Sequence, residues 1–331
     1  MPFQKIKVLV VNNSPKLSFM LRKSMPQDSA FQEIKFVNGF SEAVSVLKTY
    51  RPDVILAENQ LQGEEVAALI EAVDIPVVVM SRYEDNIENH WERAADFVFL
   101  PKCSEKSSWR AFCSEVCVKL KIAAASGSSK NSANSQPITS EKPSERVILI
   151  GASTGGTDAT AQIIRNLPDH LPGIVIVQHM PSGFTKMYAQ RLNDICGIRV
   201  AEAKDGDRVE CGKALIAPGG LHLVLKKDRN GYYVHCIQGE RVNGHCPSVG
   251  VLFDSAAKIA GPGTVGVLLT GMGKDGAEGL LHMRQAGAYT IGQDKATCVV
   301  YGMPMEAFKL GAVVKQAPLH KIADLIVRYY Q

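Results

Sequence analysis

Three turns in the second half of the chain each present one reactive side chain, namely Ser153, His179 and Asp275. A serine hydroxyl keeps its proton at neutral pH, so it attacks a carbonyl group efficiently only when a neighbouring imidazole takes that proton. A carboxylate behind the imidazole fixes the tautomer of the ring and stabilises the cation that forms. The three residue types therefore predict nucleophilic acyl transfer, if the fold brings the turns together.

The turn that carries Ser153 reads Gly151-Ala-Ser-Thr-Gly155, which has the G-x-S-x-G spacing of a tight strand-to-helix turn. Small neighbours let the serine project, and the start of a following helix offers free backbone N–H groups to an oxyanion. Such a turn also occurs where two elements simply pack tightly, so the spacing alone does not identify a nucleophile. A phosphate-binding loop is a third interpretation, disfavoured because the Lys-Ser/Thr ending of a P-loop is absent.

The histidine and the aspartate also have structural alternatives. Asp275 could cap the helix expected after Gly276, and a histidine after a strand is often a hydrogen-bonded structural residue. Seven other histidines compete with His179 for the role of base: His90, His170, His222, His235, His245, His282 and His320. The chain order of Ser, His and Asp also differs from the orders in α/β-hydrolases, chymotrypsin-like enzymes and subtilisins.

Each of the three turns follows a short apolar segment typical of a buried strand and precedes a stretch with a helical pattern. These segments are Val147–Ile150, Ile174–Val177 and Val265–Leu269. In an open α/β sheet, ligand sites lie beyond the carboxyl ends of the strands. We therefore predict an α/β domain with a largely parallel sheet that carries all three side chains on the same edge.

The first part of the chain also alternates short apolar strands with stretches of helical length, which predicts a parallel sheet with right-handed crossovers. The expected strands are Ile6–Val11, Ile34–Val37, Val54–Ala57, Val77–Met80 and Phe97–Phe99. Ser14 is the expected N-cap of the first helix, and Pro15 suits its first position.

A segment of different composition separates the two parts. Residues 121–145 read KIAAASGSSKNSANSQPITSEKPSE, with few large apolar side chains, which indicates a flexible linker. This divides the 331 residues into a domain over 1–120, a linker over 121–145 and a second domain over 146–331.

The composition excludes several classes of protein. Lys and Arg total 37 against 33 Asp and Glu, and this formal charge of +4 is too small and too dispersed to indicate binding to nucleic acid. No apolar stretch reaches the ~18 residues of a membrane-spanning helix. The eight cysteines show neither repeated C-x-x-C spacing nor the density of a disulfide scaffold. We expect a cytoplasmic protein with no metal, no cofactor and no membrane insertion.

From Arg146 to the C-terminus, several long motifs follow one another. They include IGASTGGT, VQHMPSGFTKMYAQRLN, IAPGG, LLTGMGKDGAEG, MRQAGAYTI and YGMPMEA. With these motifs, this part of the chain closely resembles the catalytic domain of the chemotaxis protein-glutamate methylesterases, the CheB family, whose members also deamidate receptor glutamines. The resemblance implies hydrolysis of glutamate γ-methyl esters on methyl-accepting chemoreceptors, and it makes a chemotaxis histidine kinase a further candidate partner.

The resemblance also implies a role for each site residue. Ser153 corresponds to the nucleophile, His179 to the general base and Asp275 to the carboxylate that orients the base. The backbone N–H groups of Thr154 and Met272 match the oxyanion donors. In the implied reaction, Ser153 attacks the γ-carbonyl of a methylated glutamate, methanol leaves, and water activated by His179 hydrolyses the acyl-enzyme.

Three positions depart from the pattern of the family. Gly244 and Gly250 stand where an Arg and an Asp are usual, and Cys246 replaces a residue that is commonly basic. A basic surface that faces the acidic receptor would be thinned, which bears on substrate affinity more than on chemistry. His245 and Asn243 remain, and His245 either lines the cleft or has a structural role.

The first part of the chain resembles the response-regulator receiver that precedes the esterase domain in this family. A receiver has a flavodoxin-like fold. A receiver uses acidic residues to hold Mg²⁺ and to accept the phosphoryl group. Here Asn12 and Asn13 occupy the positions of the acidic pair, and Glu58 occupies the phosphoacceptor position. Ser81 keeps the hydroxyl position, whereas Leu100 stands where a lysine is expected. We therefore expect no useful phosphorylation.

Glu58 allows two interpretations. Its carboxylate could imitate a permanently phosphorylated state, or it could be an ordinary exposed carboxylate left after the chemistry was lost. We favour the second, because a carboxylate has fewer oxygens and less charge than a phosphate. The sequence thus predicts a methylesterase whose control does not depend on receiver phosphorylation. A non-catalytic adaptor that binds receptors or kinase is the alternative, disfavoured by the intact Ser153, His179 and Asp275.

Overall fold

The computed structural model describes residues 5–61, 64–82, 94–101, 106–126, 146–180 and 182–331. The chain divides into two compact units, Met1–Ser132 and Ala133–Gln331. Helix α4 runs to Ser126, so residues 121–126 of the expected linker continue this helix. The predicted linker therefore begins too early in the chain, because the three alanines that precede Ser126 favour a helix.

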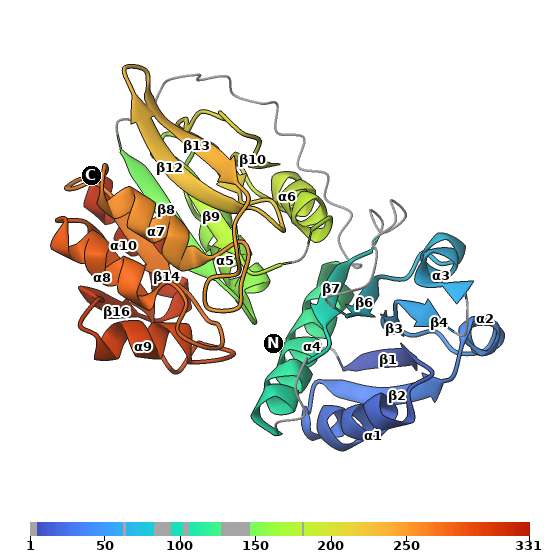
Figure 1. The fold of residues 1–331 in the computed structure, drawn as a ribbon. Coiled ribbons are helices and arrows are strands. Elements are labelled where there is room, and N and C mark those ends of the chain that lie inside the picture. Colours follow the sequence, from blue (N-terminus) through green and yellow to red (C-terminus); the bar gives the residue numbers. More distant parts are fainter. Residues whose placement is uncertain (1–4, 62–63, 83–93, 102–105, 127–145, 181) are drawn as a thin grey trace. The chain divides into compact units, whose positions relative to one another are not determined.

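The first unit contains a five-stranded parallel sheet with the strand order β2-β1-β3-β6-β7 (Figure 1). This is the order of flavodoxin-like folds, so the predicted receiver-like architecture is confirmed. The elements are β1 (Ile6–Val11), α1 (Pro15–Ser24), the 3₁₀ helix η1 (Met25–Gln27), β2 (Phe31–Val37), α2 (Phe40–Leu47), β3 (Val54–Glu58), the short strands β4 (Gln60–Leu61) and β5 (Glu64–Glu65), α3 (Val66–Ala72), β6 (Val77–Ser81), β7 (Asp96–Phe99) and α4 (Lys106–Ser126).

The core of this unit lies between the sheet and helices α1 and α4, which pack against each other. Helix α4 buries Phe112, Cys113, Val116 and Cys117, which recur at helical spacing and form one apolar face. Ser14 caps α1, because its side chain accepts a hydrogen bond from the N–H of Leu17. The predicted helix start is therefore confirmed.

The second unit contains a seven-stranded sheet with the order β10-β11-β9-β8-β14-β15-β16, in which every neighbouring pair is parallel. The prediction of a largely parallel sheet is confirmed. The elements are β8 (Val147–Ala152), α5 (Gly156–Arg165), β9 (Gly173–Gln178), α6 (Phe184–Ile195), β10 (Arg199–Glu202), β11 (Lys213–Ile216), β12 (His222–Asp228), β13 (Gly231–Ile237), α7 (Val249–Ala257), β14 (Val265–Leu268), α8 (Ala277–Gln285), β15 (Tyr289–Gln293), α9 (Met303–Lys309), β16 (Lys315–Ala317) and α10 (Leu319–Tyr330).

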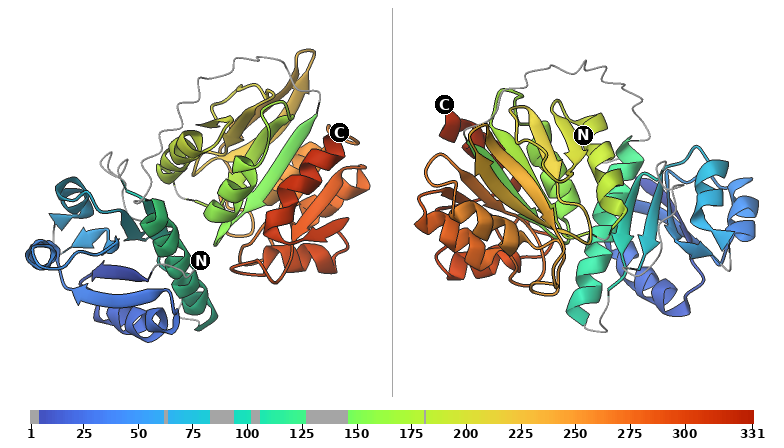
Figure 2. Two further views of the ribbon diagram at one scale, coloured as in Figure 1. Left: turned by 180° about the vertical axis from the view of Figure 1, so that it is seen from behind. Right: turned by 45° about the horizontal axis from the view of Figure 1, so that its top comes forward.

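Helices cover both faces of this sheet (Figures 1 and 2). Helix α5 packs against α6 and α10, whereas α7 packs against α8 and the antiparallel hairpin of β12 and β13. The central strands β8 and β9 are buried along their whole length. A sheet buried on both faces needs continuous apolar strands, which is why β8, β9 and β14 are predictable from the sequence. The other four strands of this sheet, β10, β11, β15 and β16, were not predicted from the sequence.

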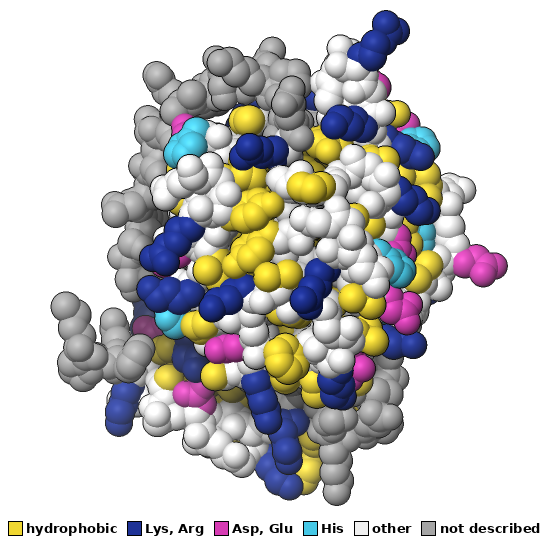
Figure 3. All heavy atoms as spheres, turned by 90° about the vertical axis from the view of Figure 1, so that its left-hand side faces the viewer, with side chains coloured by type: hydrophobic (Ala, Val, Ile, Leu, Met, Phe, Trp, Pro, Cys, Tyr) yellow, Lys and Arg dark blue, Asp and Glu magenta, His cyan; other side chains and the backbone are white. Residues whose placement is uncertain are grey.

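The surface agrees with the modest net charge. On the face that Figure 3 presents, Lys and Arg side chains lie in many separate places, between Asp, Glu and apolar side chains. No helix in the described part of the chain is long and apolar enough to cross a membrane.

Candidate active site

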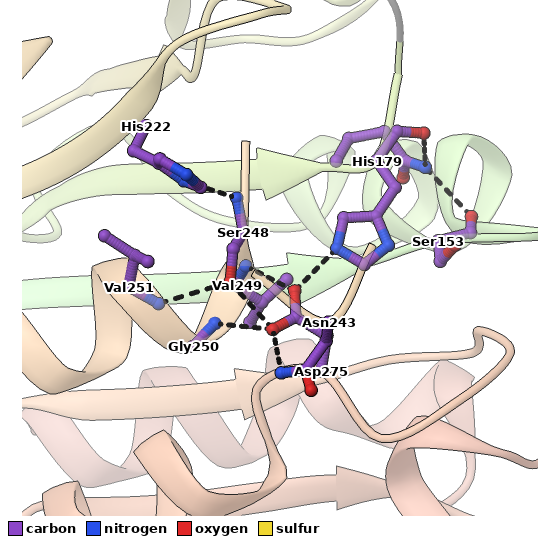
Figure 4. Close-up of polar contacts among 10 residues, drawn as sticks. Ser153, His179, His222, Asn243, Ser248, Val249, Gly250, Val251 and Asp275 are labelled. Atoms are coloured by element: carbon purple, nitrogen blue, oxygen red, sulfur yellow. Dashed lines mark hydrogen bonds and ion pairs between the residues drawn. The ribbon is translucent and has the colours of Figure 1, made fainter. Parts of the chain in front are cut away.

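The sheet order places the three reactive turns next to one another. Strand β8 lies between β9 and β14, so Ser153, which follows β8, has His179 on one side and Asp275 on the other. Nε2 of His179 lies 2.7 Å from Oδ2 of Asp275, and both side chains are only 1% exposed. Figure 4 shows the ring of His179 between Asp275 and Ser153. The structure thus brings the predicted triad residues together.

Glycines shape the turn that carries Ser153. The N–H of Ser153 donates to the carbonyl of Thr270 at 3.0 Å, which ties the turn to the end of β14. Gly155 has a φ of +77°, and a Cβ there would lie 2.6 Å from the side chain of Val299. Only glycine meets both conditions, and its position lets α5 begin directly behind Ser153.

Asp275 lies at the N-terminus of helix α7. Its carboxylate accepts hydrogen bonds from the hydroxyl of Ser248 at 2.7 Å and from the N–H groups of Val249 and Gly250 at 2.7 and 3.2 Å. The side-chain amide of Asn243 donates a fourth bond, at 3.2 Å. Asp275 therefore caps α7, which is remote in sequence. The alternative that it caps the following helix is wrong, since the N-cap of α8 is Gly276 and makes no side-chain hydrogen bond.

These contacts keep Asp275 ionised. Burial alone would raise the pKa of the carboxyl, but the hydrogen bonds from His179, Ser248 and the amide of Val249 outweigh burial and hold this pKa below its usual range. The dipole of α7 also favours a negative charge at this end of the helix. Ser248 was not among the predicted site residues, because no local spacing links it to Asp275.

The tautomer of His179 follows from this charge. An ionised carboxylate only accepts hydrogen bonds, so Nε2 of His179 carries the proton in the neutral ring. Nδ1 is then the basic nitrogen. It is buried, has no hydrogen-bond partner within the described residues, and lies on the side of Ser153 (Figure 4). The ring of His245 stacks on the ring of His179, which assigns His245 a place against the base.

The two expected oxyanion donors border Ser153. Thr154 follows Ser153 directly, and Met272 belongs to the turn after β14. A Cβ on the neighbouring Gly271 would lie 2.7 Å from Cβ of Ser153. The turn after β14 therefore passes directly against the serine, which needs glycine at position 271.

The part of the chain that carries this site also matches a known protein family. The model of the CheB methylesterase family matches residues 148–326. The chain belongs to the CheB methylesterase family.

Relatives of known name match nearly the whole chain. A protein-glutamate methylesterase/protein-glutamine glutaminase 2 from Syntrophomonas wolfei is 42% identical, with 99% of this chain and 98% of the relative covered. One of the same name from Pseudomonas aeruginosa is 38% identical, with 98% and 96% covered. The solved catalytic domain of Thermotoga maritima CheB methylesterase is 40% identical, covers 56% of this chain and 98% of its own length, and has a TM-score of 0.55.

This CheB family member departs from the family pattern at three positions, and the structure explains two of them. The N–H of Gly250 donates to Oδ1 of Asp275, and a Cβ at this position would lie only 3.1 Å from the same oxygen, so glycine suits the close approach. Asn243 and Gly244 have φ values of 51° and 82° and form a tight turn closed by the mutual hydrogen bonds of Val242 and His245. Asn-Gly is the favoured pair for such a turn. Nothing in the structure explains Cys246.

The side chains of Asn12 and Glu58, at two of the receiver positions of this CheB family member, each accept hydrogen bonds from neighbouring residues. Oδ1 of Asn12 accepts hydrogen bonds from the N–H of Ser14 at 3.1 Å and from the hydroxyl of Ser18 at 3.0 Å. Oε2 of Glu58 accepts from the N–H of Asn13 at 3.3 Å. Glu58 is 8% exposed, so the interpretation of an ordinary exposed carboxylate is wrong. The oxygen of Asn12 that could bind a cation is already used.

The last two receiver positions, Ser81 and Leu100, lie at the ends of strands β6 and β7. Ser81 ends β6, is buried, and donates its hydroxyl hydrogen to the carbonyl of Arg82. Leu100 follows β7 and contributes an apolar side chain to the core of the unit. Among the described residues of both units, no group of three or more His, Cys, Asp or Glu could hold a metal ion.

Proposed function

We propose that this protein is a serine esterase that hydrolyses γ-methyl esters of glutamate on methyl-accepting chemoreceptors and deamidates glutamines there. The main support for the proposal is the buried hydrogen bond of 2.7 Å between His179 and Asp275, beside Ser153 at the end of the central strand β8. The names of the relatives support the choice of substrate. The relatives from Syntrophomonas wolfei and Pseudomonas aeruginosa are both named as enzymes, so the adaptor alternative gains no support.

The proposed reaction has two steps. The hydroxyl oxygen of Ser153 attacks the γ-carbonyl carbon while Nδ1 of His179 takes the hydroxyl proton. The N–H groups of Thr154 and Met272 stabilise the oxyanion, and methanol leaves with the proton from His179. Water then attacks the acyl-enzyme as His179 takes its proton, and glutamate and free Ser153 result. With a glutamine substrate, ammonia leaves in place of methanol.

Asp275 supports both steps without taking a proton. Its ionised carboxylate accepts the hydrogen bond from Nε2–H of His179 and so keeps Nδ1 available as the base. The positive charge that forms on His179 lies next to this carboxylate in a site shielded from water, where the attraction between the two charges is strong.

We also propose that receiver phosphorylation does not control this activity. Two of the three expected carboxylates are amides, and the side-chain oxygen of Asn12 and one oxygen of Glu58 already accept internal hydrogen bonds. Mg²⁺ prefers hard, anionic oxygen ligands, so Asn12, Asn13 and Glu58 together provide few ligands that suit it.

We also propose that the protein is cytoplasmic, since the seven described cysteines are all thiols.

The test is methanol release from a methylated chemoreceptor by the full-length protein and by its Ser153→Ala variant. We expect release by the first protein and a loss of at least about 10³-fold in the second, because covalent catalysis needs the hydroxyl. Equal release by both proteins would exclude Ser153 as nucleophile. No release by the unchanged protein from any methylated receptor offered would exclude the proposed substrate.

A further inference from the structure

The side chain of Gln178 lies between the nucleophile and the base. Gln178 is the last residue of β9, and its backbone pairs with Ala152, the last residue of β8. Ser153 and His179 are the next residues of the two strands, at the point where the ladder of strand hydrogen bonds ends. Gln178 is 3% exposed, so its amide group is enclosed by protein.

The amide of Gln178 connects the backbones of the two reactive residues. Nε2 donates one hydrogen bond to the carbonyl of Ser153 at 2.9 Å and another to the carbonyl of His179 at 3.3 Å. Both partners are carbonyl oxygens, which only accept, so the NH₂ end of the amide must face them. Figure 4 shows these two bonds beside the labelled Ser153 and His179.

The rest of the site is adapted to this amide. A Cβ at Gly156, the first residue of α5, would lie 2.4 Å from Oε1 of Gln178, so the glycine makes room for it. Oε1 is buried and has no hydrogen-bond partner among the described residues. A buried acceptor without a partner destabilises a protein, and an apolar side chain of the same size would avoid this cost. The amide is therefore explained by its two donated bonds.

We propose that Gln178 is a positioning residue that sets the distance and orientation of Ser153 relative to His179. It does not touch the reacting atoms. Its two hydrogen bonds extend the connection between β8 and β9 by one residue and hold both backbones where the strands diverge. Because an error of about 1 Å in the placement of reacting groups can reduce a rate by ~10², loss of this connection should slow the chemical step. The inference rests on the proposed esterase function.

Three variants test the inference in the full-length protein. Gln178→Met keeps the volume of the side chain and removes both donors. Gln178→Glu keeps one donor when its carboxyl group is protonated, a form that burial between two carbonyls favours. Gln162→Met is the matched control, because Gln162 is an exposed residue of α5. Two rates are measured: methanol release from a methylated receptor, and covalent labelling of Ser153 by a fluorophosphonate, which needs no particular ester.

We expect Gln178→Met to lower kcat and the labelling rate by about 10- to 100-fold, with KM within about twofold of its normal value. The rates of Gln178→Glu should lie between those of Gln178→Met and of the unchanged protein while its carboxyl group is protonated. Once rising pH removes the proton, they should be equal to or lower than those of Gln178→Met, because the carboxylate has no donor and is repelled by the two carbonyl oxygens. A filling role alone would leave the Met variant fully active, and this result would overturn the inference. Absence of Ser153 labelling in the unchanged protein would overturn it too. Normal labelling without methanol release would instead count only against the proposed substrate.

Discussion

The imidazole ring of His245 lies flat against that of His179, with the ring centroids 3.6 Å apart and an angle of 7° between the planes. His245 reaches this place from the tight turn of Asn243 and Gly244, and Asn243 itself donates to Asp275. One short turn thus contacts both His179, the proposed base, and Asp275, the carboxylate proposed to orient it. The stacked ring restricts the rotation of His179 and covers one of its faces.

Removal of the stacked ring should slow the enzyme moderately. Aromatic pairs contribute about 0.5–1.5 kcal/mol beyond the area they bury, so His245→Ala should lower kcat by roughly 2- to 12-fold. His245→Phe keeps a ring over His179 and should retain most of the activity. Val242→Ala, a change of an exposed residue in the same segment, is the control. A kcat for His245→Ala equal to that of the control would show that the stack has no role.

Neutralisation of the triad carboxylate should have a much larger effect on rate. In Asp275→Asn, the amide can present its NH₂ group to Nε2 of His179 and favour the wrong tautomer, which in such triads costs ~10⁴ in kcat. Methanol release under saturating substrate measures the loss. A variant that keeps a tenth of the activity would mean that another group orients His179.

The same carboxylate should make stability depend on pH. The pKa of Asp275 is lowered in the folded protein, so its ionised form stabilises the folded state at neutral pH. This contribution is complete above the ordinary Asp value of about 3.9 and is lost as the pH falls below it. Urea unfolding at a series of pH values should therefore show that Asp275→Asn differs most from the unchanged protein at pH 5–7 and less below about pH 4. Asp324→Asn, a change of an exposed side chain of α10, should differ little at any pH.

A small phosphodonor with Mg²⁺ should leave the rate of methanol release unchanged, because the receiver lacks two of the three expected carboxylates. The matched variant carries Asn12→Asp, Asn13→Asp and Glu58→Asp, and it should gain measurable Mg²⁺ affinity by calorimetry. Stimulation of the unchanged protein by the phosphodonor would contradict our interpretation of these three positions.

The receiver-like unit should depend on a buried ion pair. Nζ of Lys119 lies 3.1 Å from Oδ1 of Asp96, and both side chains are 1% exposed. Lys119→Met leaves the charge of Asp96 buried and should lower the free energy of unfolding by about 3–5 kcal/mol. Lys35→Met removes an exposed pair with Glu33 and should cost less than about 1 kcal/mol. Urea unfolding compares the two variants, and equal losses would rule out a special role of the buried pair.

The sequence by itself singled out the candidate groups for the chemistry. Ser153, His179 and Asp275 became candidates because each follows an apolar strand and parallel strands end on the same edge of a sheet, and the resemblance to the CheB family gave each of them a proposed role. The loss of the acidic pair at Asn12 and Asn13 was predicted from the resemblance to a receiver, which shows where carboxylates are expected. These predictions need only the sequence, since a strand and the turn after it are adjacent in the chain.

Only the tertiary structure decided how these groups are held. The order β9-β8-β14 puts Ser153 between its two partners. The N-terminus of α7 binds Asp275, and His245 stacks on the base. Gln178 joins the carbonyls of Ser153 and His179. Most of these contacts join residues tens of positions apart, and no periodicity or short motif encodes them. They arise from strand order and helix packing, which depend on the burial of the whole core.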